Sequence, residues 1–329
     1  MRRLTGADVE HARLIPGNSA LLFLTDRCPV GCAHCSVDSR RDSPRISDFG
    51  LLDEIVAGLI AMRRTTVVGI SGGEPFVERR GLTMAASTLA GAGKLLVIYT
   101  SGLWAASADV PRWATDVLAQ ASCVYLSTDA YHAAHIDDAT FVRAARAIAA
   151  AGPLIVTQVA GSAAQAKQAE SLLADALGPA WREHAEVRRV PLLTAGRGAG
   201  LSRGSHEDAQ PGADFGTCRL AAAPVVRYDG WVSACCNETV IMRGGPARLR
   251  RRVTTATELT TALTEFADDH YLRAIGTAGA GALTALPTYR DLSTQRFAHI
   301  CELCFQLSAR QPAATDQAVL TLLSQRSPA

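Results

Sequence analysis

The stretch RCPVGCAHCSVD, residues 27–38, decides the fold class of this 329-residue chain. It places three cysteines at the spacing Cys28-x3-Cys32-x2-Cys35, directly after an apolar, β-rich run at residues 19–25. In parallel α/β folds the ligand lies at the carboxyl ends of the strands, so a loop that follows a strand is the usual place for a binding site. We therefore expect a metal centre on this loop.

Five further β-rich runs alternate with helical patterns along the chain, which is typical of βα units that build a parallel sheet. We predict an α/β fold, a partial (β/α)6 barrel at residues 19–195 that follows an N-terminal extension at residues 1–18. The other predicted strands lie at 65–71, 94–100, 122–127, 154–159 and 186–192, and helices at 48–64, 112–120 and 139–152.

A second region follows a predicted linker at residues 196–216, which is rich in Gly, Ser and Asp and has no periodicity. Two short β runs flank the dipeptide Asp229-Gly230, which favours a two-residue hairpin turn. A helix is predicted at 257–275. Residues 217–310 are thus expected to form a small domain of one β-hairpin and a helix, and residues 311–329 a C-terminal helix or tail.

The composition indicates a globular protein and excludes several partners. The chain is 48% hydrophobic and 19% charged, and its formal net charge of +2 is too small to favour nucleic acid or an anionic membrane. No apolar run approaches the ~20 residues of a membrane span. We expect a cytoplasmic protein, in which the nine cysteines stay reduced and serve as ligands, reagents or core residues.

Three cysteines on one loop leave two kinds of metal centre open. A structural zinc site usually has four ligands from paired C-x2-C spacings, and only His34 lies close enough in the sequence to add one. An iron–sulfur cluster held by three thiolates leaves one iron free for a further ligand, as a catalytic cluster requires.

A second motif, SGGEP at residues 71–75, follows the second predicted strand. Together with the three-cysteine loop it resembles the signature of the radical S-adenosylmethionine (SAM) superfamily. The resemblance implies that Cys28, Cys32 and Cys35 hold a [4Fe–4S] cluster and that SAM binds its open iron. It implies contacts with SAM or substrate at His34, Gly72, Gly73, Glu74, Ser101, Ser127 and Gln158. The ring before the third cysteine is expected near the adenine, and the Gly-Gly-Glu turn near the amino group of SAM.

A second cysteine group follows the predicted linker. Cys218, Cys235 and the late pair Cys301-x2-Cys304 resemble the twitch pattern of one branch of the superfamily, a shortened form of its SPASM extension. This resemblance, which extends over about residues 19–304, implies an auxiliary [4Fe–4S] cluster with four thiolates. A structural zinc site with the same four ligands is the alternative.

Two cysteines remain. Cys123 lies in a predicted strand and is expected to pack in the core, as free cysteines commonly do. Cys236 directly follows Cys235, and neighbours on an extended segment point to opposite sides. We predict that Cys235 is a ligand and that Cys236 is a hydrogen-atom donor, as in some radical epimerases. The alternatives are that Cys236 only packs, or that it replaces Cys235 as the ligand.

Three functions are open at this stage. An epimerase of natural products would use Cys236 as the donor. A dehydrogenase would instead use the auxiliary cluster as electron acceptor and Asp129 or His132 as the base. A structural protein that binds zinc or clusters would leave SGGEP unexplained.

The expected partners are a substrate and an electron donor. The substrate class is a small molecule, such as an aminoglycoside or another sugar, or a ribosomal peptide. The segment 129–138 carries acids that would suit a cationic sugar, although a solvated loop has the same composition. The enzyme would also need a reducing partner such as a flavodoxin or ferredoxin.

Overall fold

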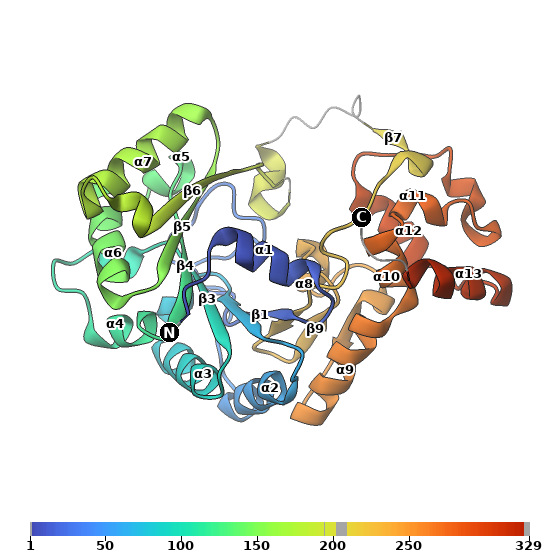
Figure 1. The fold of residues 1–329 in the computed structure, drawn as a ribbon, viewed down its shortest axis with the longest axis horizontal. Coiled ribbons are helices and arrows are strands. Elements are labelled where there is room, and N and C mark those ends of the chain that lie inside the picture. Colours follow the sequence, from blue (N-terminus) through green and yellow to red (C-terminus); the bar gives the residue numbers. More distant parts are fainter. Residues whose placement is uncertain (1, 194, 202–208, 326–329) are drawn as a thin grey trace.

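The computed structural model describes residues 2–193, 195–201 and 209–325. Its centre is a nine-stranded sheet, and the six predicted strands are neighbours in it, in chain order and all parallel (Figure 1). The α/β class is therefore confirmed. The six strands are β1 (Ser19–Phe23), β2 (Val67–Ser71), β3 (Leu95–Thr100), β4 (Ala121–Ser127), β5 (Leu154–Ala160) and β6 (Ala185–Val190).

Helices cover one face of this sheet. Every second residue of a strand points to that face, and most of these residues are apolar and buried. Val68 and Ile70 of β2, for example, pack into one core with the helices. The last turn of α6 ends at Gly152, whose φ of +111° is the left-handed conformation expected of a glycine cap. The helices of this face are α2 (Phe49–Ala61), α3 (Arg79–Gly91), α4 (Arg112–Leu118), α6 (Asp138–Ala151) and α7 (Ala163–Leu177).

The opposite face of the sheet, here called the inner face, carries helix α1 (Gly6–Leu14). Val9 and Ala12 of α1 pack there against alternate residues of the strands, among them Val67 and Val97. Cys123 belongs to the same group and is fully buried, which confirms its predicted place in the core.

The second region continues the same sheet. Strand β8 (Val225–Arg227) pairs in parallel with β1, and β9 (Trp231–Ser233) and β10 (Arg250–Arg252) extend the sheet beyond it. The predicted two-residue hairpin turn is wrong, because three residues, 228–230, separate β8 from β9. The backbone N–H of Tyr228 donates to Phe23 in β1 instead of joining the hairpin.

The predicted helix at 257–275 is also wrong in one respect. It is interrupted at Asp269, which separates α9 (Ala256–Asp268) from α10 (His270–Thr277). Asp269 leaves the helical conformation with ψ of +115°, and its carboxylate accepts from the N–H of Leu272, so it caps the second helix.

The remaining elements include the predicted C-terminal helix, α13 (Ala314–Ser324), which packs against α10. Two described segments of the predicted linker have regular structure: β7 (Gln210–Pro211) pairs with β11 (Arg296–Phe297), and a short turn of helix covers Gly196–Gly200. The other helices of this region are α8 (Glu238–Ile241), α11 (Ala280–Leu283) and α12 (Ile300–Ser308). Within the described residues, no helix has the length and apolarity needed to cross a membrane.

Candidate functional site

A cavity of about 300 Å³ opens at the carboxyl ends of the parallel strands. All three thiols of the first loop line it, and so does every other residue that the resemblance placed at SAM or the substrate. The structure therefore brings these side chains together, while their roles stay predictions. The predicted residues at the cavity are Cys28, Cys32, His34, Cys35, Gly72, Gly73, Glu74, Ser101, Ser127, Asp129, His132 and Gln158.

The Gly-Gly-Glu turn packs directly on the backbone of the thiol loop. The N–H of Gly73 donates to the carbonyl of Thr25 at 2.7 Å, and the N–H of Glu74 donates to that of Arg27 at 2.9 Å. A Cβ on Gly73 would lie 2.2 Å from the Arg27 carbonyl oxygen. Glycine is thus required here because the two loops touch. This reason differs from the one expected from the sequence, which was the close approach of a ligand to the backbone.

Glu74 joins the turn after β2 to the loop after β3. One carboxylate oxygen accepts from the hydroxyl of Thr100 at 2.9 Å, and the other from the N–H and the hydroxyl of Ser101 at 2.8 and 2.5 Å. The residue is 2% exposed, and burial raises the pKa of its carboxyl. Glu74 therefore supports the cavity wall, and its contact with the amino group of SAM stays a prediction.

Asp129 and His132 lie behind the thiol loop. The Asp129 carboxylate caps α5 (Ala130–Ala133) and lies 3.0 Å from Nδ1 of His132. One ring nitrogen of His132, the sulfur of Cys32 and one ring nitrogen of His34 lie within 4.8 Å of one another. Although burial opposes protonation, the contacts with Asp129 and Cys32 raise the pKa of His132 to about 10.

The contacts of Asp129 and His132 affect how well either residue could serve as the base that a dehydrogenase would need. Burial raises the pKa of Asp129, but hydrogen bonds from His132 outweigh burial and hold that pKa below its usual value. The Asp129 side chain is only 2% exposed. The geometry thus favours a supporting role for the Asp129–His132 pair at Cys32, and the base role stays a prediction.

Arg197 is a site residue that the sequence reasoning missed. Its guanidinium donates twice to the carbonyl of Cys32, at 3.0 and 2.9 Å, and also to Asp38 and to the carbonyl of Ser39, both at 2.8 Å. The backbone N–H of Arg197 donates to the carbonyl of Cys35 at 3.0 Å. A residue of the predicted linker therefore clamps the thiol loop.

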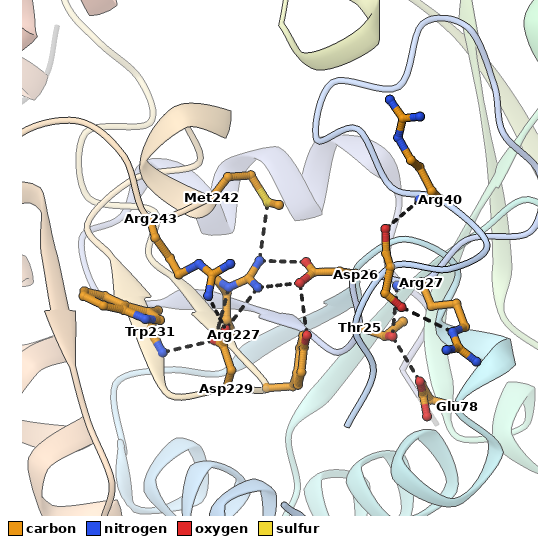
Figure 2. Close-up of polar contacts among 12 residues, drawn as sticks. Thr25, Asp26, Arg27, Arg40, Glu78, Arg227, Asp229, Trp231, Met242 and Arg243 are labelled. Atoms are coloured by element: carbon orange, nitrogen blue, oxygen red, sulfur yellow. Dashed lines mark hydrogen bonds and ion pairs between the residues drawn. The ribbon is translucent and has the colours of Figure 1, made fainter. Parts of the chain in front are cut away.

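A buried ion pair connects the thiol loop to the hairpin of the second region (Figure 2). Asp26, two residues before Cys28, accepts two hydrogen bonds from the guanidinium of Arg227 in β8, at 2.9 and 2.8 Å. Tyr228 donates to the same carboxylate at 3.0 Å, and Asp229 holds the other side of the guanidinium. The Arg227 side chain is 1% exposed, so both charges depend on each other for solvation.

Arg227→Ala is expected to lower the free energy of unfolding by about 3–5 kcal/mol, because it leaves the Asp26 carboxylate buried without its partner. Arg243 is the matched control, since it is 49% exposed and lies 3.7 Å from the same Asp229. Arg243→Ala should cost less than about 1 kcal/mol. Urea denaturation of the two variants measures the difference, and equal midpoints would show that the buried pair adds nothing.

The four thiols of the second group approach one another beside α10 and α12. Tyr271 Oη lies 3.7 Å from the Cys304 sulfur and Ser308 Oγ 3.8 Å from it. Burial, followed by the neighbouring thiols Cys301 and Cys304, raises the pKa of Cys218 to about 11. In the part of the chain that the structure describes, no three of Cys218, Cys235, Cys301 and Cys304 have all their sulfurs within 4.8 Å of one another.

Cys235 and Cys236 face different surroundings, as expected of neighbours on an extended segment. Cys235 packs on the same side as Cys218 and Cys304. Cys236 instead lines a second cavity, of about 140 Å³, on the inner face of the sheet. Ser71 and Tyr99 line both cavities, so the inner cavity, as it is called below, adjoins the cavity of the first thiol loop.

Comparison with solved structures shows proteins of the same fold. SuiB of Streptococcus suis, in its structure bound to S-adenosylmethionine, matches with a TM-score of 0.50 and 13% identity over 80% of this chain and 68% of its own. Native anSMEcpe with bound AdoMet and Cp18Cys peptide matches with a TM-score of 0.51 and 13% identity over 93% of this chain and 96% of its own. The resemblance predicted from the cysteine motifs is thus confirmed for the fold.

Two further comparisons gave no match. No family model matches the chain, and no curated protein matches its sequence.

Proposed function

We propose that the chain is a radical SAM enzyme that inverts a C–H carbon of a natural-product substrate, with the partial barrel and twitch-type region that the motifs imply. One observation carries the proposal. The cavity with three thiols adjoins an inner cavity that presents the thiol of Cys236, while Cys235 packs on the side of Cys218 and Cys304. A substrate between the two cavities would have a different reactive group on each side.

The residues of the first cavity fit the cofactors that this chemistry needs. Cys28, Cys32 and Cys35 would hold a [4Fe–4S] cluster, which with SAM supplies a 5′-deoxyadenosyl radical that removes a hydrogen atom from an unactivated carbon. His34 Nδ1 is buried at this cavity, and no described residue makes a hydrogen bond to it, so it is available to a ligand. Arg197 and Glu74 hold the surrounding loops in place.

The second thiol group fits a cluster better than a single zinc ion. Zinc–sulfur bonds of about 2.3 Å place tetrahedral thiolates ~3.8 Å apart, and the described cysteines form no such compact group. A [4Fe–4S] cluster separates its ligands more widely, because each thiolate binds its own iron. Cys218, Cys235, Cys301 and Cys304 would be those ligands.

Cys236 completes the inversion. Its S–H bond is weaker than the C–H bond that forms, so the thiol hydrogen passes to the carbon radical on the face opposite to the one that lost hydrogen. The thiyl radical left on Cys236 then takes up one electron and one proton and becomes a thiol again. A reducing protein such as a flavodoxin or ferredoxin would supply the electron.

The alternative is a dehydrogenase that oxidises a carbinol and passes an electron to the auxiliary cluster. It needs a base near the substrate. Asp129 and His132 are engaged with each other, and His132 also lies beside Cys32 of the thiol loop. The structure thus supports the epimerase better than the dehydrogenase.

The function is tested by turnover in heavy water. Candidate substrates, a sugar and a peptide, are incubated anaerobically with the reconstituted protein, SAM and a reductant. Because a thiol proton exchanges with solvent, the product should carry one deuterium at the inverted carbon and be otherwise unchanged. A product that lacks two hydrogen atoms would instead establish the dehydrogenase.

Each single replacement of Cys218, Cys235, Cys301 or Cys304 by alanine is expected to remove about half of the roughly eight irons that two clusters contribute per chain. The variants should also melt at lower temperature, because a bound cluster contributes to folding. Iron and sulfide analysis of the reconstituted proteins measures this.

Cys123→Ala is the control and should keep all the iron, since Cys123 lies in the core beneath α1. If Cys235→Ala kept its iron while Cys236→Ala lost half, the roles of the two neighbours would be exchanged.

A further inference from the structure

We infer that Arg13 binds a carboxylate of the substrate, next to the carbon that receives hydrogen from Cys236. The inference rests on the proposed function for what the substrate undergoes, but it names a feature of the substrate that the proposed function leaves open. It follows from the inner cavity and from one cation that points into it.

Most residues that line the inner cavity are apolar. Its volume of about 140 Å³ is well above the ~10–15 Å³ that one water molecule needs, so a small substituent of a substrate fits. Its described lining includes Val9, Leu21, Val67 and Val97, and it contains no Asp or Glu. Arg13, from the last turn of α1, is the one cation in that lining.

The guanidinium of Arg13 lacks an acidic partner within the residues that the structure describes. Its recorded hydrogen bond goes from Nη2 to the sulfur of Cys236, at 3.5 Å. Sulfur is a weak acceptor, and a guanidinium carries five N–H donors, so most of its capacity is unused. Both acids on the same helix are engaged elsewhere: Asp8 accepts from Thr5 at 2.8 Å, and Glu10 pairs with Arg188 at 2.6 Å.

A partly buried cation in the lining of a mostly apolar cavity normally has an anion beside it. Here the protein supplies the cation and the room, and a ligand would supply the anion. Guanidinium groups bind carboxylates through two parallel hydrogen bonds, which also fixes orientation.

The contact between Arg13 and Cys236 sets the position of the reacting carbon. A carboxylate on the guanidinium would lie beside the thiol, so the carbon that accepts hydrogen lies within a bond or two of the carboxylate. The substrate class is therefore a molecule with a carboxylate close to the inverted carbon. A purely cationic sugar, which the acids at 129–138 suggested, does not fit this cavity.

The test uses the reconstituted, cluster-containing protein and two alkylating reagents of similar size, iodoacetate and iodoacetamide. Both react with the thiolate of Cys236, so the ratio of their rates does not depend on how much thiolate is present. Only iodoacetate carries a carboxylate. Tandem mass spectrometry, with fragments that separate Cys236 from the adjacent Cys235, gives both rates. N-acetylcysteine in the same tube gives the ratio for a free thiol.

The iodoacetate-to-iodoacetamide ratio at Cys236 should exceed that of N-acetylcysteine about tenfold or more, as a charge-assisted bond would give. Arg13→Gln should abolish the excess, and Arg13→Lys should keep most of it. Arg3→Gln is the matched control, because Arg3 precedes the same helix but bonds to the carbonyl of Gly152. The ratio requires no turnover, so it tests Arg13 even if the proposed reaction is wrong.

Equal ratios at Cys236 and N-acetylcysteine in the wild-type protein would overturn the inference, whether or not the variants fold. So would an excess that survives Arg13→Gln in a protein with its full iron content.

Discussion

Replacing Cys28, Cys32 and Cys35 together by alanine is expected to abolish the formation of 5′-deoxyadenosine from SAM. The three thiols line one cavity, and no other group of three cysteines is found at it. Without them, no thiolates would be left beside the Gly-Gly-Glu turn to hold the proposed cluster, which would supply the electron that cleaves SAM. Liquid chromatography of the anaerobic reaction, with dithionite as reductant, measures the product.

The triple variant should nevertheless keep about half of its iron, because the second thiol group lies elsewhere in the fold. Cys123→Ala serves as the matched control and should form 5′-deoxyadenosine at the wild-type rate. Cleavage of SAM that persists in the triple variant would show that the first loop is not the reactive centre.

Cys236→Ala should remove inversion while it leaves hydrogen abstraction intact. The variant keeps all seven presumed ligands, so it should hold both clusters and form 5′-deoxyadenosine. The carbon radical would have no donor on its second face, and the deuterium-labelled product that the wild-type protein makes in heavy water should fall below detection. The radical would be quenched slowly or would lose an electron and a proton to give an oxidised product.

Cys236→Ser is the matched variant for this prediction. It keeps the shape of the side chain and a terminal hydrogen, but its O–H bond is too strong to give hydrogen to a carbon radical, so it should fail in the same way. If either variant inverted its substrate at the wild-type rate, Cys236 would not be the donor.

Local sequence patterns were sufficient for the six parallel strands and for the meeting of the first thiol loop with the Gly-Gly-Glu turn. The six strands are short apolar runs between helical patterns. The predicted ends of each strand lie within two residues of the observed ends. The first cysteines and the Gly-Gly-Glu turn follow neighbouring parallel strands, so their meeting at one edge of the sheet could be predicted. The divergence of Cys235 and Cys236 followed from the alternation of an extended chain.

Contacts between distant parts of the chain could not be predicted from local patterns. Arg197 meets Cys32 across 165 residues, and Asp26 meets Arg227 across 201. Neither Arg197, in a Gly-rich segment, nor Arg227, in a short β run, has a local feature that indicates its contact. The break at Asp269 was missed because an acid inside an amphipathic pattern also suits a continuous helix, and only its cap contact shows that a second helix begins. Arg13 was missed because α1 packs on the inner face through contacts with strands that are distant in the sequence, and no local pattern indicates those contacts.

The most direct test of the central claim is the reductive cleavage of SAM by the wild-type protein. The protein is reconstituted anaerobically with iron and sulfide, its iron is quantified, and SAM and dithionite are added. The proposed radical chemistry predicts that 5′-deoxyadenosine and methionine accumulate together in equal amounts. Intact SAM in a preparation that holds its full complement of iron would contradict it.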